Sequence, residues 1–170
     1  MSSGGISSKN SQGDAPDKEG INEKSELVQY ILALFMSDDA APIRGRIMLV
    51  KEAFLLVKEI VPELTETVRF FSYQWGPYSN DVAKTVNWLI DNGYVESSKK
   101  NRETVYSLTP KGKIFAQNAT SAIDKDVFEN IAKMKRTTHE IGLSRLLTFI
   151  YSQYPQYATH SRGKAIYANY

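Results

Sequence analysis

Apolar side chains recur along most of the chain at intervals of three or four residues, which is the spacing of one face of an α-helix. Leu27 and Ile31 begin the first such segment, with Ser25 as its candidate N-cap and the polar run 37–42 as its end. The same reasoning predicts helices over residues 25–36, 43–61, 79–92, 110–121, 124–136, 139–154 and 159–168.

Two regions carry β-branched and aromatic residues instead of a helical pattern. Residues 68–75 are predicted to form one short strand, which Gly76 and Pro77 break before a new helix starts. Residues 94–97 and 104–108 are predicted to form a hairpin with the polar residues between them at its tip. The predicted fold class is mainly α with a small β-hairpin.

The N-terminal part of the chain differs in composition from the rest. Residues 1–24 are rich in Ser, Gly, Asn and charged residues, and too little apolar surface is present to offset chain entropy. We therefore expect a disordered tail over residues 1–24, a domain over 25–122 that includes the first helix, and a C-terminal helical extension over 123–170.

Composition narrows the class of protein. The hydrophobic fraction of 42% is enough to form a core, and the absence of cysteine excludes disulfides and thiolate chemistry. The first apolar run, residues 27–36, is too short to cross a bilayer, and no secretory signal precedes it. A soluble cytoplasmic protein without membrane contact is expected.

Charge is distributed unevenly along the chain. The net charge is +2 overall, whereas residues 42–170 hold eighteen Lys and Arg against twelve Asp and Glu, a net charge of +6. A mildly basic folded part permits nucleic-acid binding without requiring it.

Two junctions in the sequence resemble a known architecture. The run Trp88-Leu-Ile-Asp-Asn-Gly-Tyr-Val95 resembles the point in MarR- and PadR-type transcription regulators where the recognition helix passes into the first wing strand. Tyr106-Ser-Leu-Thr-Pro-Lys-Gly112 resembles the end of their wing, where a YxLTxxG run leads into the next helix. The resemblance implies a winged helix with added N- and C-terminal helices, in which residues 79–92 are the recognition helix.

A second resemblance is narrower. Phe70-Phe-Ser-Tyr-Gln-Trp-Gly-Pro-Tyr-Ser79 is similar to the F-x-Y-x-x-GP-[YFV]-S segment of small prokaryotic proteins of the YwgA and Panacea-like type. Residues 146–157, followed by Ser161, resemble the YPEY…S tail of archaeal members. This resemblance covers about residues 43–161 and implies a DNA-binding or antitoxin role.

The resemblance to a winged helix identifies candidate DNA contacts, because in that fold one helix enters the major groove and the wing touches phosphate. Asn and Ser can read base edges, and Lys and Arg can neutralise phosphates. Helix 79–92 itself has a net charge of −1, which favours the wing as the main contact. The predicted DNA-binding residues are Ser79, Asn80, Lys84, Asn87, Trp88, Lys99, Lys100 and Arg102, and the alternative is that they are ordinary solvated residues.

Two further groups of residues have two interpretations each. The first group either extends a basic surface or consists of solvated helix ends, and its members are Arg44, Arg46, Lys133, Lys135 and Arg136. The second group either packs in a core, which strand alternation favours, or lines a pocket, and its members are Phe70, Phe71, Tyr73, Trp75, Tyr78 and Trp88. The tyrosines from Tyr151 onward are expected to pack against a partner helix or a second copy.

Catalytic and metal-binding patterns are missing from the sequence. His139 and His160 lie 21 residues apart without a ligand spacing, and there is no phosphate-binding glycine loop, nucleophile elbow or carboxylate cluster. We therefore predict no enzymatic activity, no metal and no cofactor.

Two functions remain open. The first is a winged-helix transcription regulator that binds double-stranded DNA and dimerises through helix 25–36 and the C-terminal helices. The second is a winged-helix protein-interaction module, such as an antitoxin or an adaptor subunit, which the acidic recognition helix favours.

Overall fold

The computed structural model describes residues 20–159 of the 170-residue chain. This part is mainly α-helical with two small antiparallel sheets, which confirms the predicted mainly-α class with a β-hairpin. In chain order the elements are α1 (Glu26–Ala40), β1 (Ile43–Arg44), α2 (Arg46–Leu55), the π-helix η1 (Leu56–Ile60), the 3-10 helix η2 (Pro62–Glu66), β2 (Phe71–Tyr73), β3 (Gly76–Tyr78), α3 (Asn80–Asp91), β4 (Val95–Lys100), β5 (Glu103–Leu108), α4 (Pro110–Ala119), α5 (Lys125–Gln153) and the 3-10 helix η3 (Pro155–Tyr157). Most of the predicted tail and of the predicted helix 159–168 lies outside the described residues. Between residues 20 and 159, none of the helices is long and apolar enough to cross a membrane.

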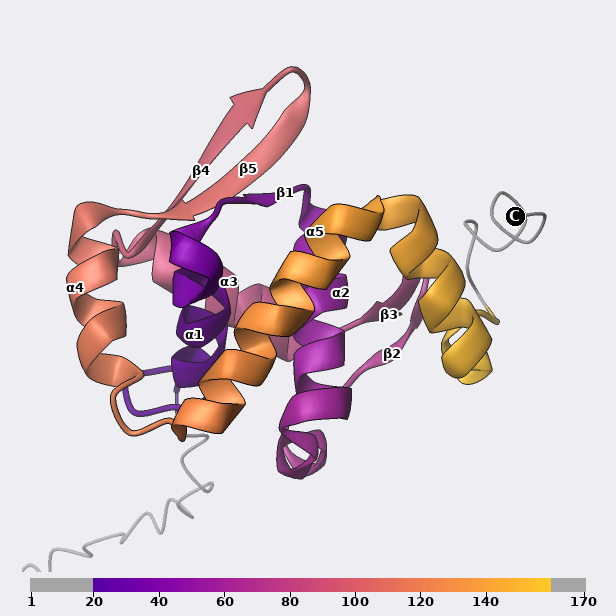
Figure 1. The fold of residues 1–170 in the computed structure, drawn as a ribbon, viewed down its shortest axis with the longest axis horizontal. Coiled ribbons are helices and arrows are strands. Elements are labelled where there is room, and N and C mark those ends of the chain that lie inside the picture. The colour runs from indigo at the N-terminus through magenta and orange to yellow at the C-terminus, as the bar shows by residue number, and fades with distance from the viewer. Residues whose placement is uncertain (1–19, 160–170) are drawn as a thin grey trace, which may run out of the picture.

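Helix α1 is the centre of the fold. Five consecutive residues, Ile31 to Phe35, are each at most 1% exposed. A run of this kind cannot lie on a single face of a helix, so α1 must be covered on all sides. Helices α3, α4 and α5 pack around it (Figure 1). Most of the apolar surface of α1, which is predicted to join a second copy, is therefore used within one chain.

The segment predicted as one helix over 43–61 is divided into three elements. Ile43 and Arg44 form a strand, β1, which pairs with Tyr106 and Val105 of β5. Gly45 follows with φ +90°, a conformation that favours glycine, and only then does α2 begin. The last turn widens into the π-helix η1, where the Val61 N–H donates to the carbonyl of Leu56. The prediction was wrong at the start because pairing with β5 is not visible in local periodicity.

Residues 71–78 form a hairpin instead of one strand. Phe71 pairs with Tyr78 and Tyr73 with Gly76, so Gly76 and Pro77 open strand β3 and do not end the sheet. Gly76 has φ +86°, and the Tyr151 ring of α5 lies 3.0 Å from the place where a Cβ would stand. The hairpin therefore needs glycine at this position both for its backbone and for the close approach of α5.

The second hairpin, β4–β5, projects from the helical body (Figure 1). Its strands pair from Val95 with Leu108 to Lys100 with Glu103, so they run further into the polar link than predicted. Asn101 and Arg102 form the two-residue turn, both with positive φ. This is the turn geometry that fits the twist of a tight hairpin. Because β5 also pairs with β1, the hairpin is attached to the start of α2.

Helices α4 and α5 complete the core. Helix α4 begins as predicted, with Thr109 as N-cap and Pro110 in its first turn. The two helices predicted over 124–136 and 139–154 both lie within α5, which is kinked at Gly142 by φ +79° and ψ 170°, so the break falls a few residues after its predicted position. Ile131 and Leu146 of α5 belong to the same hydrophobic cluster as α1, so the predicted boundary near residue 122 separates segments that pack together.

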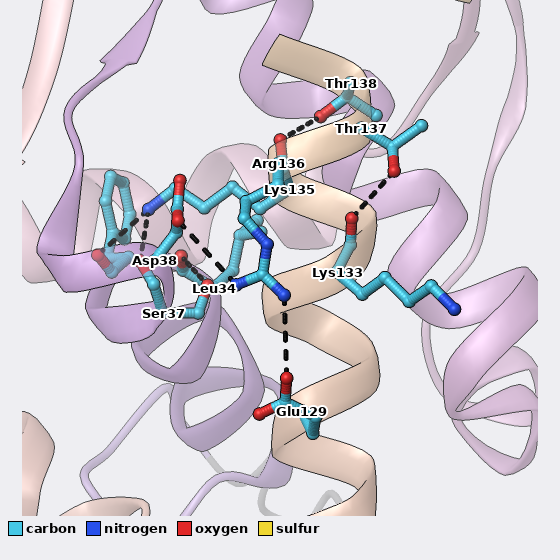
Figure 2. A network of polar contacts seen from close by, with 10 residues as sticks. Leu34, Ser37, Asp38, Glu129, Lys133, Lys135, Arg136, Thr137 and Thr138 are labelled. Carbon is cyan, nitrogen blue, oxygen red and sulfur yellow. Dashed lines mark hydrogen bonds and ion pairs between the residues drawn. The ribbon is translucent and has the colours of Figure 1, made fainter. Parts of the chain in front are cut away.

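A polar network ties α5 to the end of α1 (Figure 2). Lys135 is fully buried, and its Nζ donates to the carbonyls of Phe35 at 3.2 Å and Ser37 at 2.9 Å. The Arg136 guanidinium pairs with Asp38 at 3.8 Å and Glu129 at 3.5 Å. Of the predicted basic run 133–136, Lys135 therefore stabilises the end of α1 from inside the fold, and Arg136 is partly neutralised.

A second buried polar contact joins α2 to the part of α5 that follows Lys135. Glu52 of α2 is fully buried, accepts a hydrogen bond from the Thr138 hydroxyl and has one oxygen 3.0 Å from Nε2 of His139. Nε2 of His139 is thus within ion-pair distance of a buried carboxyl group, although it makes no hydrogen bond to any described residue. Within residues 20–159 no cluster of three or more His, Cys, Asp or Glu could hold a metal ion.

Candidate nucleic-acid interface

The predicted contacts on α3 do not all reach the surface. Asn80, Lys84 and Asn87 are exposed. Ser79 is fully buried, because its hydroxyl caps α3 by accepting a hydrogen bond from the Val82 N–H at 3.3 Å. Ser79 therefore cannot read a base edge in this conformation, and its predicted role as a DNA contact is corrected to that of a helix cap.

Trp88 is also only partly accessible to a partner. It is partly buried against the core, and its ring lies 5.9 Å from that of Tyr94, centroid to centroid. Only part of the indole remains available to a partner. Of the predicted contacts on α3, two amides and one lysine are therefore fully exposed.

The tip of the β4–β5 hairpin carries the three predicted cations. Lys99, Lys100 and Arg102 are all exposed. Lys99 and Lys100 lie opposite Thr104 and Glu103 across the hairpin. The projecting tip therefore holds three positive charges and one negative charge at the point furthest from the core (Figure 1).

A groove continues the positive surface from this tip toward the body. We call it the arginine groove, and it is lined by Pro42, Arg44, Gly45, Arg46, Ile47, Met48, Arg102, Glu103, Thr104, His139 and Leu143. Its volume is about 680 Å³. Arg44 and Arg46 are exposed, and Arg44 lies 3.9 Å from the exposed carboxylate of Glu103, a contact that water weakens. Three arginines from β1, the start of α2 and the hairpin turn therefore meet in one groove.

A second hollow adjoins the groove at Arg46. We call it the aromatic hollow, and it is lined by Arg46, Ile47, Val50, Lys51, Phe71, Tyr73, Trp75, Gly76, Tyr78 and Asn80. Its volume is about 480 Å³. The rings of Phe71, Tyr73 and Tyr78 contact one another with centroids 5.5 to 6.2 Å apart. The guanidinium of Arg46 lies 3.4 Å from the Tyr78 hydroxyl, so one arginine borders both the groove and the hollow.

The aromatic residues are divided between core and surface. Phe70 packs edge to face on Phe54 with centroids 5.1 Å apart, as the core interpretation expects. Phe71 and Tyr73, which alternate with the inward position on β2, remain 42% and 49% exposed. Tyr154 and Tyr157 pack on Phe54 of helix α2 within the same chain, which agrees with the expected packing against a partner helix, and contact with a second copy stays a prediction.

Lys51 lies in the floor of the aromatic hollow. It is 3% exposed, and its Nζ donates to the carbonyl of Pro77 at 2.8 Å. Burial lowers the pKa of Lys51 to about 7, because removing the ammonium from water disfavours its charged form. Sequence reasoning missed this residue, although a lysine directly after Val50 on a buried helix face is the signal that would have drawn attention to it.

Comparison of the chain with protein-family models, with curated proteins and with solved structures finds no match. The function is therefore inferred from the geometry of the described residues.

Proposed function

We propose that this protein is a winged-helix nucleic-acid-binding protein that holds the phosphate backbone of DNA with its β4–β5 hairpin and arginine groove. A transcription regulator is the biological role that best suits such a protein. The observation that carries the proposal is the meeting of exposed cations from three separate chain segments in one groove beside the projecting hairpin.

The order of the elements supports this fold assignment. Helix α1, strand β1, helices α2 and α3 and the hairpin β4–β5 follow one another, and the sheet has the strand order β1-β5-β4. A winged helix uses this order, with the helix before the hairpin entering the major groove and the hairpin lying along the backbone. The β2–β3 hairpin then takes the place of the short turn between the two helices.

Charge distribution decides which parts would contact phosphate. The exposed cations of the hairpin tip and groove are Lys99, Lys100, Arg102, Arg44 and Arg46. Helix α3 carries Lys84 between Asp81 and Asp91. The Asp81 carboxylate accepts a hydrogen bond from the backbone N–H of Arg69 at 3.0 Å, so it stabilises the loop before β2. Affinity would therefore come from the hairpin and groove, while Asn80 and Asn87 are the α3 side chains suited to base edges.

The salt dependence of DNA binding tests the proposal. Each lysine or arginine that neutralises a phosphate adds about 0.9 to the slope of log K against log [salt]. Replacing Lys99, Lys100 and Arg102 with alanine should reduce the slope by up to about 2.7, if each makes one phosphate contact. A matched triple variant, Lys113→Ala, Lys125→Ala and Lys133→Ala, removes three exposed lysines from α4 and α5 and should leave the slope unchanged.

Two results would contradict the proposal. One is wild-type protein without salt-dependent affinity for duplex DNA at any concentration up to about 100 µM, a range that includes ordinary non-specific binding. The other is an equal loss of slope in the two triple variants, which would show that total charge and not this surface is responsible.

A second candidate function is a protein-interaction module without sequence-specific DNA reading, such as an antitoxin or adaptor subunit. The exposed ring pair of Phe71 and Tyr73 favours it, because large exposed aromatics are typical of protein interfaces. One stoichiometric protein partner that is purified with the chain in nuclease-treated extracts, and is lost on Tyr73→Ala, would favour this function over the first.

A further inference from the structure

We propose that the aromatic hollow binds one nucleotide, with an unstacked base between its aromatic walls and the phosphate beside Arg46. The proposal deepens the proposed function, on which it rests for the case in which the nucleotide belongs to a bound strand. A free mononucleotide has the same chemistry, and the experiments below distinguish the two sources.

The walls of the hollow suit a planar aromatic ligand. Phe71 and Tyr73 are 42% and 49% exposed, although burying these side chains would be favourable. Together with Tyr78 they form a set of tilted and edge-to-face rings. Every base has an aromatic face, and single-strand-binding proteins hold bases by stacking them on such side chains.

The charge of the hollow favours an anion. Arg46, an exposed cation, lines it beside the buried Lys51, and no Asp or Glu is among its lining residues. A quaternary ammonium would be repelled by Arg46 and would meet no carboxylate among the described residues of the hollow. An aromatic ring that carries a negative group is thus the complementary occupant, and a nucleotide has both parts.

The position of Arg46 explains how the two parts would be arranged. Its guanidinium stands at the Tyr78 hydroxyl, and it lines both the hollow and the arginine groove. A phosphate bound at Arg46 can therefore belong to a nucleic-acid strand whose sugar-phosphate backbone runs along the groove toward Arg102. The base of that nucleotide would then turn into the hollow, away from the strand.

One polar side chain is placed to read the base. The exposed side-chain amide of Asn80 lines the hollow and offers one donor group and one acceptor. Lys51 is buried and its Nζ is bonded to the Pro77 carbonyl, so it contributes to the wall of the hollow and not to base reading. The volume of about 480 Å³ lies in the range of small-molecule sites, so a whole nucleotide unit can enter.

The hollow is held in shape by contacts with the distant end of the chain. The Ser72 hydroxyl donates to the carbonyl of Tyr157 at 3.0 Å, and Tyr151 packs against Gly76. A preformed site avoids part of the ordering cost of binding. This is consistent with a binding role for the β2–β3 hairpin.

The first experiment compares two DNA probes by fluorescence anisotropy at constant salt. One is a blunt duplex, and the other is the same duplex with three unpaired nucleotides at one end. Wild-type protein should bind the second probe about tenfold more tightly. Tyr73→Ala should remove that gain and keep the affinity for the blunt duplex. The matched control is Phe149→Ala, an aromatic of similar exposure (44%) that does not line the hollow, and it should keep the gain.

The second experiment separates base from phosphate and a strand from a free nucleotide. Adenosine monophosphate should bind in calorimetry and should abolish the gain from the unpaired nucleotides, whereas ribose 5-phosphate should do neither. Adenosine monophosphate binding that requires Tyr73, without any gain from unpaired nucleotides, would assign the site to the free nucleotide.

The outcomes also separate this inference from the proposed function. Equal affinity for the two probes together with no binding of adenosine monophosphate overturns the inference, and salt-dependent duplex binding would still stand. Equal binding of ribose 5-phosphate and adenosine monophosphate overturns it as well, because the base would then make no contribution. A protein partner that depends on Tyr73, with no nucleotide binding, assigns the hollow to protein recognition and overturns it too.

Discussion

Replacing Lys51 with methionine should change how the stability of the protein depends on pH. Burial lowers the pKa of Lys51 to about 7, from 10.5 in the unfolded chain. Between these two values the unfolded state binds more protons than the folded state, so the free energy of unfolding rises with pH. One proton of difference corresponds to a slope of about 1.4 kcal/mol per pH unit. Methionine has no proton to lose and should remove this contribution.

The size of the effect follows from the two buried lysines. From pH 7 to pH 9.5, a shift from 10.5 to about 7 at Lys51 contributes a rise of about 3 kcal/mol. Burial also lowers the pKa of Lys135 to about 8, although Glu52 and Asp38 raise it in part, and this contributes about 2 kcal/mol over the same interval. Wild-type stability should therefore rise by about 5 kcal/mol, and that of Lys51→Met by about 2 kcal/mol.

Urea unfolding followed by circular dichroism at pH 7.0, 8.0, 9.0 and 9.5 measures both curves. The series stops at pH 9.5 because the raised pKa of Tyr154, about 12, makes the folded state lose stability at higher pH, where the unfolded tyrosine ionises first. Lys113→Met, at an exposed lysine, should reproduce the wild-type curve. An equal rise in wild type and Lys51→Met would refute the link between burial and protonation at this residue.

Three further substitutions test the packing and capping. Gly112→Ala should destabilise by about 3 kcal/mol or more, because a Cβ would stand 1.8 Å from the Tyr94 carbonyl oxygen and the backbone must move. Ser79→Ala removes the hydroxyl that accepts from Val82 and should cost about 1 kcal/mol in thermal or urea unfolding. Phe54→Ala deletes a fully buried ring that three other aromatics contact edge to face, and should cost about 3 to 5 kcal/mol by the same measurement.

Lys113→Ala is the common control for these three, since exposed substitutions of this kind stay within about 0.5 kcal/mol. If Gly112→Ala were as stable as this control, the close packing of α4 on the start of β4 would be wrong. A cost below about 1 kcal/mol for Phe54→Ala would show that the aromatic cluster is not packed as described.

The sequence predicts the start and end of a helix or hairpin where capping and turn residues next to it determine these positions. Ser79 before α3, the Asn92-Gly93 stop after it and the Thr109-Pro110 start of α4 each act through backbone hydrogen bonds a few residues away. The hairpin β4–β5 was recognised for the same reason, because its turn and strands lie within fourteen residues, Val95 to Leu108.

Features that depend on distant partners could not be derived in this way. Ile43 becomes a strand through its pairing with Tyr106, and Gly76 opens a strand where Tyr151 packs over it. The break in α5 is a different case, because it lies at Gly142, whose positive φ favours glycine and whose Cβ position has no atom of the described residues within 4 Å, a few residues after the predicted break at 136–139. In each case tertiary contacts or backbone geometry outweigh the local pattern.

The candidate site also contains some features that follow from the local sequence and others that depend on distant residues. The exposed positions of Lys99, Lys100 and Arg102 follow from a polar hairpin tip, which is a local property. The buried state of Lys135 could not be predicted, because its two carbonyl partners belong to residues about a hundred positions earlier. Arg46 acquires its place between groove and hollow only in the folded chain, where β3 packs against α2 and β5 pairs with β1 just before α2 begins.

The central position of α1 has a consequence for how the protein is made. The ribosome synthesises this helix before α5, and Lys135, which donates a hydrogen bond to the carbonyl of Phe35 in α1, follows that residue by 100 positions. At about 5 to 20 residues per second, roughly 5 to 20 s pass before that part of α5 has been synthesised. During this interval the apolar surface of α1 that packs against α5 is exposed, so it can aggregate or bind a chaperone. A stalled or truncated chain that lacks α5 should therefore be held by chaperones or degraded, whereas a chain that includes α5 folds.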